Sequence, residues 1–285
     1  MTCRGAQAPR RGVEVCALFA LAAAGFVVAG MAPARAEFKV RSPIVDYREI
    51  EFEHNGDVTI DRPGSGKNNG QSYTYELEFG ALPFWQPGIE AETGVDPGAN
   101  QRFSATTFEN LFQLTPQGQY WADLGFFTEF SHAAGRNEPD SITFGPLVQK
   151  QLPNIFGLDL GYDTLHTANL LVSKEIGSNR QDATPLSVSW QSRLRLNSYL
   201  EPGLEYYGNL SSIAGSSTGT PVQHRMGPVL VGQYNMFQYG KIKYEAGYLF
   251  GLNNATEQGA FRWRFEYEKA FGASAGSPRA PARAA

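Results

Sequence analysis

Polar and apolar residues alternate along much of the chain. From residue 261 to 268 every aromatic residue occupies one phase and every charged residue occupies the other. The same period of two appears over 73–79, 186–196 and 242–250. Successive side chains point to opposite faces only in an extended strand, so the pattern predicts strands with one apolar face and one charged face.

About twelve segments of this kind have the length of a barrel strand. They lie near residues 46–54, 71–80, 87–94, 104–114, 119–131, 141–151, 163–175, 185–197, 201–209, 223–234, 241–250 and 259–271. Polar, mostly long connections follow the odd segments, and shorter connections with aromatic residues follow the even ones. This alternation is typical of outer loops and inner turns, so we expect an all-β, antiparallel transmembrane β-barrel of about twelve strands, give or take about two.

Two Gly-Pro pairs fall inside expected strands, at Pro146 and Pro228. Proline has no N–H to donate to a neighbouring strand. We therefore expect a bulge or a strand end at each of these positions.

The N-terminal region has the three parts of a secretory signal peptide. Three arginines precede an apolar stretch over 15–32, and the small residues Ala34 and Ala36 form a cleavage motif after it. An uncleaved membrane anchor is the alternative. The expected organisation is a cleaved signal peptide over 1–36, an outer-membrane barrel over 37–271 and a disordered tail over 272–285.

Cysteine usage and charge exclude several classes of function. Cys3 and Cys16 both lie in the leader, so the mature chain has no disulfide, thiolate metal site or cysteine nucleophile. The leader also holds four arginines and one glutamate, which leaves 20 basic and 27 acidic residues and a net charge of −7. This balance disfavours nucleic acid as a partner.

Charged side chains of the strands should point into the barrel, because a lipid-facing Arg or Lys costs about 2–4 kcal/mol at mid-membrane. Early strands carry mostly acidic residues and late strands mostly basic ones, so the lumen would have an acidic arc and a basic arc. Either the two arcs create a transverse field that orients solutes, or their charges pair across the lumen and plug it. The residues predicted to line a pore are Glu76, Glu78, Glu90, Glu92, Asp123, Glu129, Arg193, Arg195, Lys241, Lys243, Arg262 and Arg264.

The last expected strand resembles the C-terminal assembly signal of Gram-negative outer-membrane β-barrels. The resemblance rests on aromatic residues at every second position from Phe261, followed by a final Phe271. It implies that the barrel assembly machinery recognises this strand. The residues expected to face lipid there are Phe261, Trp263, Phe265, Tyr267 and Phe271.

Three further segments, 144–150, 227–230 and 247–252, resemble an outer-membrane family named for a MetA pathway of phenol degradation. The resemblance covers roughly 40 to 271, the span of the expected strands. It implies a barrel linked to the uptake of hydrophobic or aromatic compounds, and it brings no catalytic residues with it.

Other candidate chemistry is weak. The four histidines have no spacing that places two metal ligands on one face, so we expect no metal and no cofactor. Ser131 and His132 are adjacent in an expected strand and face opposite ways, which is unsuitable for a nucleophile and its base. The glycine-rich loop over 64–70 lacks the spacing of a phosphate-binding loop. We expect no enzyme.

The sequence therefore predicts a protein of the cell outer membrane that acts as a passive channel for small solutes. The alternative is a non-conducting structural or adhesive barrel, and a lipid-modifying enzyme is the third and least favoured hypothesis. The expected partners are outer-membrane lipid and lipopolysaccharide, the barrel assembly machinery and small solutes.

Overall fold

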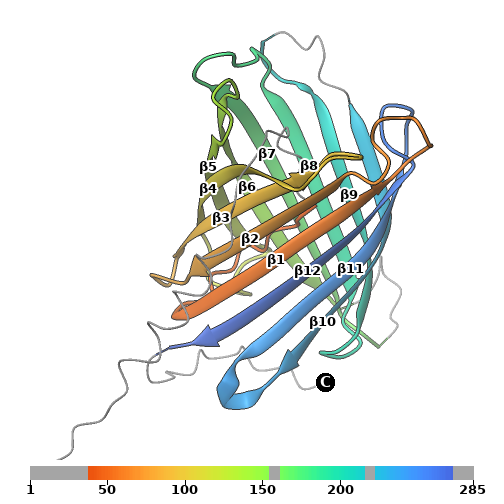
Figure 1. The fold of residues 1–285 in the computed structure, drawn as a ribbon. Coiled ribbons are helices and arrows are strands. Elements are labelled where there is room, and N and C mark those ends of the chain that lie inside the picture. The colour runs from red at the N-terminus through yellow and green to blue at the C-terminus, as the bar shows by residue number, and fades with distance from the viewer. Residues whose placement is uncertain (1–37, 154–160, 216–221, 272–285) are drawn as a thin grey trace, which may run out of the picture.

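Twelve β-strands make up most of the described residues, which are 38–153, 161–215 and 222–271 of a computed structural model (Figure 1). In chain order they are β1 (Glu49–Ile60), β2 (Gln71–Phe79), β3 (Trp85–Val95), β4 (Arg102–Gln113), β5 (Asp123–Ala133), β6 (Asp140–Leu152), β7 (Thr164–Ile176), β8 (Pro185–Leu194), β9 (Glu201–Ser212), β10 (Gln223–Asn235), β11 (Lys241–Gly251) and β12 (Gly259–Ala270). A short 3₁₀ helix, η1 (Phe237–Tyr239), precedes β11. Within the described ranges, no helix has the length and apolar character needed to cross a membrane.

Each strand pairs antiparallel with the next one, and β12 returns to pair with β1, which closes the barrel. The expected all-β antiparallel barrel is therefore confirmed, and each of the twelve expected segments overlaps one observed strand. Closure leaves no strand with an unpaired edge. The connections after the even strands lie at the same end of the barrel as the start of β1, which we call the turn end, and those after the odd strands lie at the opposite end, the loop end. The expected difference in length is wrong, because the connections over 114–122 and 153–163 at the turn end are longer than that over 96–101 at the loop end.

The first strand is longer than the sequence pattern predicts. The run Asn55-Gly56-Asp57 was expected to begin a loop, but β1 continues to Ile60. Asn55 and Asp57 are buried on the inner face, and Asn55 Nδ2 donates a hydrogen bond to Thr74 Oγ1 at 3.0 Å. Polar residues continue a strand here because the interior that they face is itself polar.

The two Gly-Pro pairs do not interrupt their strands, so the predicted bulges or strand ends are wrong. β6 keeps one register along β7 on both sides of Gly145 and Pro146, with only these two positions unpaired. The Pro146 ring points outward, where it is exposed. Gly145 faces inward, and a Cβ atom there would collide with the carbonyl oxygen of Leu170. Because Gly145 has no side chain, β7 can lie close to β6 at this point, although Pro146 has no N–H to donate to it.

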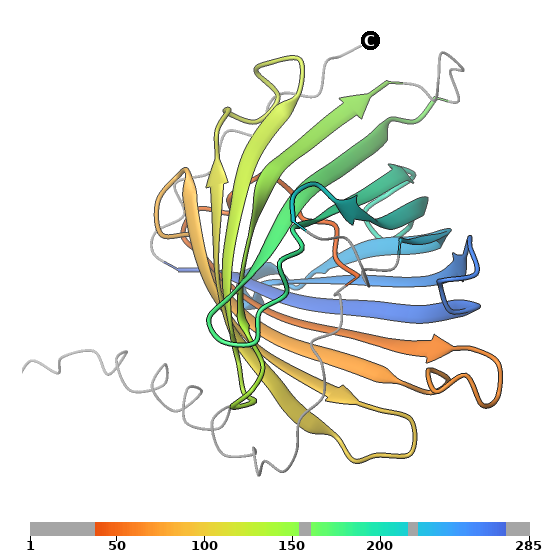
Figure 2. The same ribbon diagram turned by 90° about the horizontal axis from the view of Figure 1, so that it is seen from above.

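Residues 38–46 precede β1 and run inside the barrel rather than along its wall (Figure 2). Two small apolar clusters hold this segment, which we call the lumen segment. Near its C-terminal end, Val45 packs with Leu111, Phe127 and Leu147. Nearer its N-terminal end, Val40 packs with Tyr207 and Leu249.

The close approach at Gly145 gives a test of the strand packing. Gly145→Ala should destabilise the barrel by about 1–3 kcal/mol, because the new methyl group forces β6 and β7 apart. Gly247→Ala is the matched control, since a Cβ atom there meets its nearest neighbour at 3.1 Å. The measurement is the urea midpoint of the refolded chain, followed by gel mobility before and after boiling. Equal midpoints for the two variants would contradict this packing.

Candidate functional site in the barrel lumen

Carboxylates face one another across neighbouring strands inside the barrel. Glu53 of β1 lies opposite Glu76 of β2 and opposite Glu266 of β12. Farther round the wall, Glu109 of β4 lies opposite Glu129 of β5. Like charges directly opposite each other destabilise a sheet, and burial strengthens their repulsion. The acidic arc therefore needs cations from outside its own strands.

The lumen segment supplies these cations. Lys39 Nζ lies 2.7 Å from Glu53 Oε1 and also pairs with Glu76. Arg41 Nη2 lies 2.6 Å from Glu109 Oε1 and 3.8 Å from Glu129 Oε2. Each cation thus sits between two carboxylates that face each other across adjacent strands.

Side-chain amides of the wall hold the backbone of the lumen segment. Asn169 of β7 both accepts a hydrogen bond from Arg41 N and donates one to Arg41 O, each at 2.8 Å. Gln113 of β4 accepts a hydrogen bond from Val45 N at 2.8 Å. A buried peptide group needs a partner, so these amides replace the strand ladder that the segment lacks. They also fix its position along the barrel.

The basic residues of β12 pair with carboxylates of other strands. Arg262 of β12 pairs with Glu205 of β9 and with Glu245 of β11, the latter at 2.9 Å. Arg264 pairs with Glu245 as well, and its Nε lies 3.8 Å from Glu53.

The arginines of β8 behave in the same way. Arg193 Nε and Arg195 Nε each lie 3.1 Å from an oxygen of Glu201 at the start of β9. Arg193, Arg195 and Arg264 therefore do not pair with the glutamates of β2 and β3 across the lumen. Their partners include Glu201 of β9 and Glu245 of β11, which sequence reasoning missed because they lie within the predicted basic arc, and Arg264 also lies near Glu53 of β1.

The residues predicted to line a pore lie on the inner face or rim of the barrel. Eleven are in strands, and Arg195 directly follows β8. They are Glu76, Glu78, Glu90, Glu92, Asp123, Glu129, Arg193, Arg195, Lys241, Lys243, Arg262 and Arg264. Lys39 and Arg41 of the lumen segment were missed, because they precede the first alternating segment and no periodic pattern marks them.

The opposite phase of β12 lies on the outer face. The exposed side chains there are Phe261, Phe265, Tyr267 and, just after the strand, Phe271. Trp263 packs over Gly56, where a Cβ atom would collide with the indole ring. Contact of these residues with lipid stays a prediction. The expected cleavage residues Ala34 and Ala36 and the expected tail over 272–285 lie outside the described residues.

Two cavities occupy the lumen around the segment. A cavity of about 270 Å³ lies toward the turn end, with Asp46 and Arg195 in its wall. A cavity of about 610 Å³ lies toward the loop end, with Lys67 and Glu257 in its wall. Lys39 and Arg41 belong to both walls, so these two residues stand at the boundary between the cavities.

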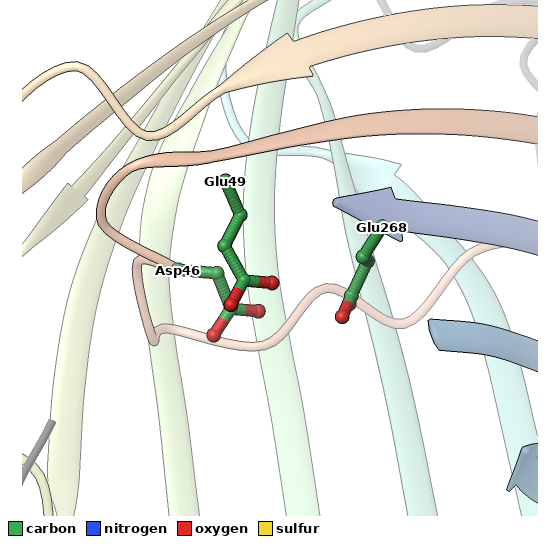
Figure 3. A group of neighbouring side chains, drawn as sticks. All are labelled: Asp46, Glu49 and Glu268. Carbon is green, nitrogen blue, oxygen red and sulfur yellow. The ribbon is translucent and has the colours of Figure 1, made fainter. Parts of the chain in front are cut away.

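Carboxylates also gather at the turn end, where they could hold a metal ion. Asp46, Glu49 and Glu268 form one group, and Figure 3 shows that they come from the lumen segment, β1 and β12. Glu51, Glu266 and Glu268 form a second, fully buried group. A third group joins Glu76, Glu78 and Glu109, beside the cations of the lumen segment.

These features define the molecule as a closed, antiparallel, twelve-stranded β-barrel with an occupied, charged lumen. A scan against protein-family models finds no match. A search of curated proteins finds no match either. Among solved structures, the chain is similar to the translocator domain of the autotransporter NalP from Neisseria meningitidis. The two are 16% identical over 78% of this chain and 88% of that chain, with a TM-score of 0.44.

Arg41 gives a test of how the lumen segment is held. Arg41→Gln leaves Glu109 and Glu129 facing each other without a cation, which should cost about 3–5 kcal/mol and release the segment. Val40→Cys, in a chain with Cys3→Ser and Cys16→Ser, reports the release as faster maleimide labelling, because Val40 is buried in the intact barrel. Arg136→Gln, at an exposed loop position, is the control. Equal labelling rates would show that Arg41 does not anchor the segment.

Proposed function

We propose that the chain is an outer-membrane barrel that passes small solutes, with Lys39 and Arg41 of the lumen segment forming its constriction. The distribution of side chains supports the membrane location. Large apolar residues are exposed on the outer face, among them Phe52, Phe108, Phe250 and Phe265. Buried positions hold many charged residues. This is the reverse of a soluble protein and is typical of a barrel in lipid.

The observation that carries the channel proposal is the pair of cavities that meet at Lys39 and Arg41. A lumen filled by close packing from end to end would leave no such space on either side of a narrow segment. Charged and amide side chains form much of both walls. These walls favour small polar or charged solutes over the hydrophobic or aromatic compounds that the family resemblance implies, because apolar solutes gain nothing from charged groups.

The non-conducting structural barrel is the alternative, and the packing of the lumen segment favours it. The segment is held by two ion-paired cations, by side-chain amides and by two apolar clusters. If it stays in place, the two cavities remain separate chambers. The proposals thus differ in one measurable property, which is the passage of ions through the barrel.

Conductance in planar bilayers separates the two. We expect the refolded full chain to conduct weakly, and a variant lacking residues 38–46 to conduct strongly with a preference for cations, because carboxylates then dominate the lumen. A double variant, Lys39→Gln with Arg41→Gln, retains residues 38–46 but loses their ion pairs to the wall, so it should give an intermediate conductance. If none of the three conducts although all show a gel shift on boiling, the barrel is structural.

The membrane location can be tested on β12. Phe265→Arg places a charge mid-strand on the outer face, which should cost about 2–4 kcal/mol in a bilayer and lower the folded fraction in lipid vesicles. Phe271→Arg, just beyond the strand end, should cost only about 0–1 kcal/mol. The readout is gel mobility without boiling. Equal folded fractions would mean that this face does not lie in hydrocarbon.

A further inference from the structure

A second row of facing carboxylates lies next to the one that Lys39 neutralises. Glu51 of β1 is opposite Glu78 of β2 on one side and opposite Glu268 of β12 on the other. The lumen segment places no ion pair on Glu51 in the described structure. The Glu51 side chain is 4% exposed, and its Oε1 has no hydrogen-bond partner. A buried, unpartnered carboxylate oxygen is costly and points to a missing cation.

The oxygens around Glu51 have the spacing of a cation site. One oxygen each from Glu51, Glu266 and Glu268 lie within 4.8 Å of one another, and all three residues are buried. Glu268 also belongs to the group with Asp46 and Glu49, whose oxygens meet the same limit (Figure 3). Five carboxylates are therefore linked through one shared residue. Three come from the chain around the start of β1 and two from the end of β12.

Two lysines of β11 neutralise only part of this charge. Lys241 pairs with Glu268, and Lys243 pairs with Glu266 at 2.8 Å, with Asp46 at 3.7 Å and with Glu268. Two ammonium groups against five carboxylates leave three negative charges. Glu78, opposite Glu51, adds to them. At low dielectric this excess repels strongly, and a divalent ion offsets most of it.

We propose that this cluster binds a calcium ion between Glu51, Glu266 and Glu268, with Asp46 and Glu49 within reach at the rim. Calcium takes six to eight oxygen ligands in flexible geometry, and carboxylates are its usual protein ligands, so a cluster of several carboxylates suits it. Magnesium keeps several of its waters and is usually bound through only one or two carboxylates, so this cluster suits it less. Sequence reasoning tested histidine spacing, which does not detect a site made of carboxylates from both ends of the chain.

The site does not depend on the channel proposal, because it would exist in a conducting or a closed barrel. It does connect the two parts of the molecule that meet at the turn end. Asp46 is the last residue of the lumen segment, and Glu268 belongs to the strand that closes the barrel. An ion held by both would fasten the segment to the seam between β1 and β12.

Titration of the refolded full chain with Ca²⁺ by isothermal calorimetry tests the proposal. We expect binding at about 0.1–1 mM, the range of sites outside the cytosol, and a rise in unfolding temperature. Glu51→Gln should weaken binding by at least about tenfold, as loss of a ligand does. Glu92→Gln is the matched control, because it removes an interior carboxylate toward the loop end. Gel mobility checks that every variant folds.

A second variant, Lys243→Met, tests the proposal in the opposite direction, because it should strengthen binding. It removes the ammonium group that competes for Glu266 and Glu268 and that repels a cation, so it should tighten Ca²⁺ binding by about tenfold. The proposal is overturned if neither the unchanged chain nor Lys243→Met binds Ca²⁺ at 10 mM, a level about tenfold above the expected range. It is also overturned if Glu51→Gln and Glu92→Gln weaken binding equally. Binding of Mg²⁺ as tight as that of Ca²⁺ would reject the choice of ion.

Discussion

Carboxylates that face each other across adjacent strands are the constraint on which the interior of this barrel depends. The pairs Glu53–Glu76 and Glu109–Glu129 repel each other, and burial of Glu53, Glu76 and Glu109 strengthens that repulsion. Lys39 and Arg41 relieve that repulsion from a segment that belongs to no strand. A barrel of twelve strands is wider than one that its own side chains fill, so it has room for such a segment. Wall and segment are therefore electrostatically complementary parts of one structure.

The same arrangement explains why the lumen is only partly filled. Apolar contacts hold the segment at Val40 and Val45, and ion pairs hold it at Lys39 and Arg41. The cavities that remain lie beyond these contacts, one toward each end. Buried ion pairs specify a position more than they add net stability, because desolvation offsets much of their attraction. The ion pairs therefore fix the position of the lumen segment, but they are not the main source of the stability of the barrel.

Much of the fold could be predicted because polar and apolar side chains that alternate with a period of two indicate both how many strands there are and which face of each strand is apolar. The continuation of β1 through Asn55 could not be predicted, since turn propensity assumes that polar residues leave the sheet and Asn55 faces a polar interior. The unbroken register of β6 past Pro146 could not be predicted either, because the sequence does not show that two positions can stay unpaired without shifting the strand. The same alternation predicted that the charged residues point inward. It did not predict their partners, because pairs such as Arg262 with Glu205 join strands that lie far apart in the sequence.

The position of the lumen segment also affects the seam at which the barrel closes. The segment reverses direction into β1 at Arg48, which has a positive φ of 64°. Pairing of β1 with β12 joins the two ends of the sheet and brings Glu53 opposite Glu266. Lys39 lies beside Glu53, so the lumen segment partly neutralises the charge at this seam. Closure of the wall and occupation of the lumen are therefore coupled: the seam between the first and last strands is least repulsive when the segment lies inside the barrel.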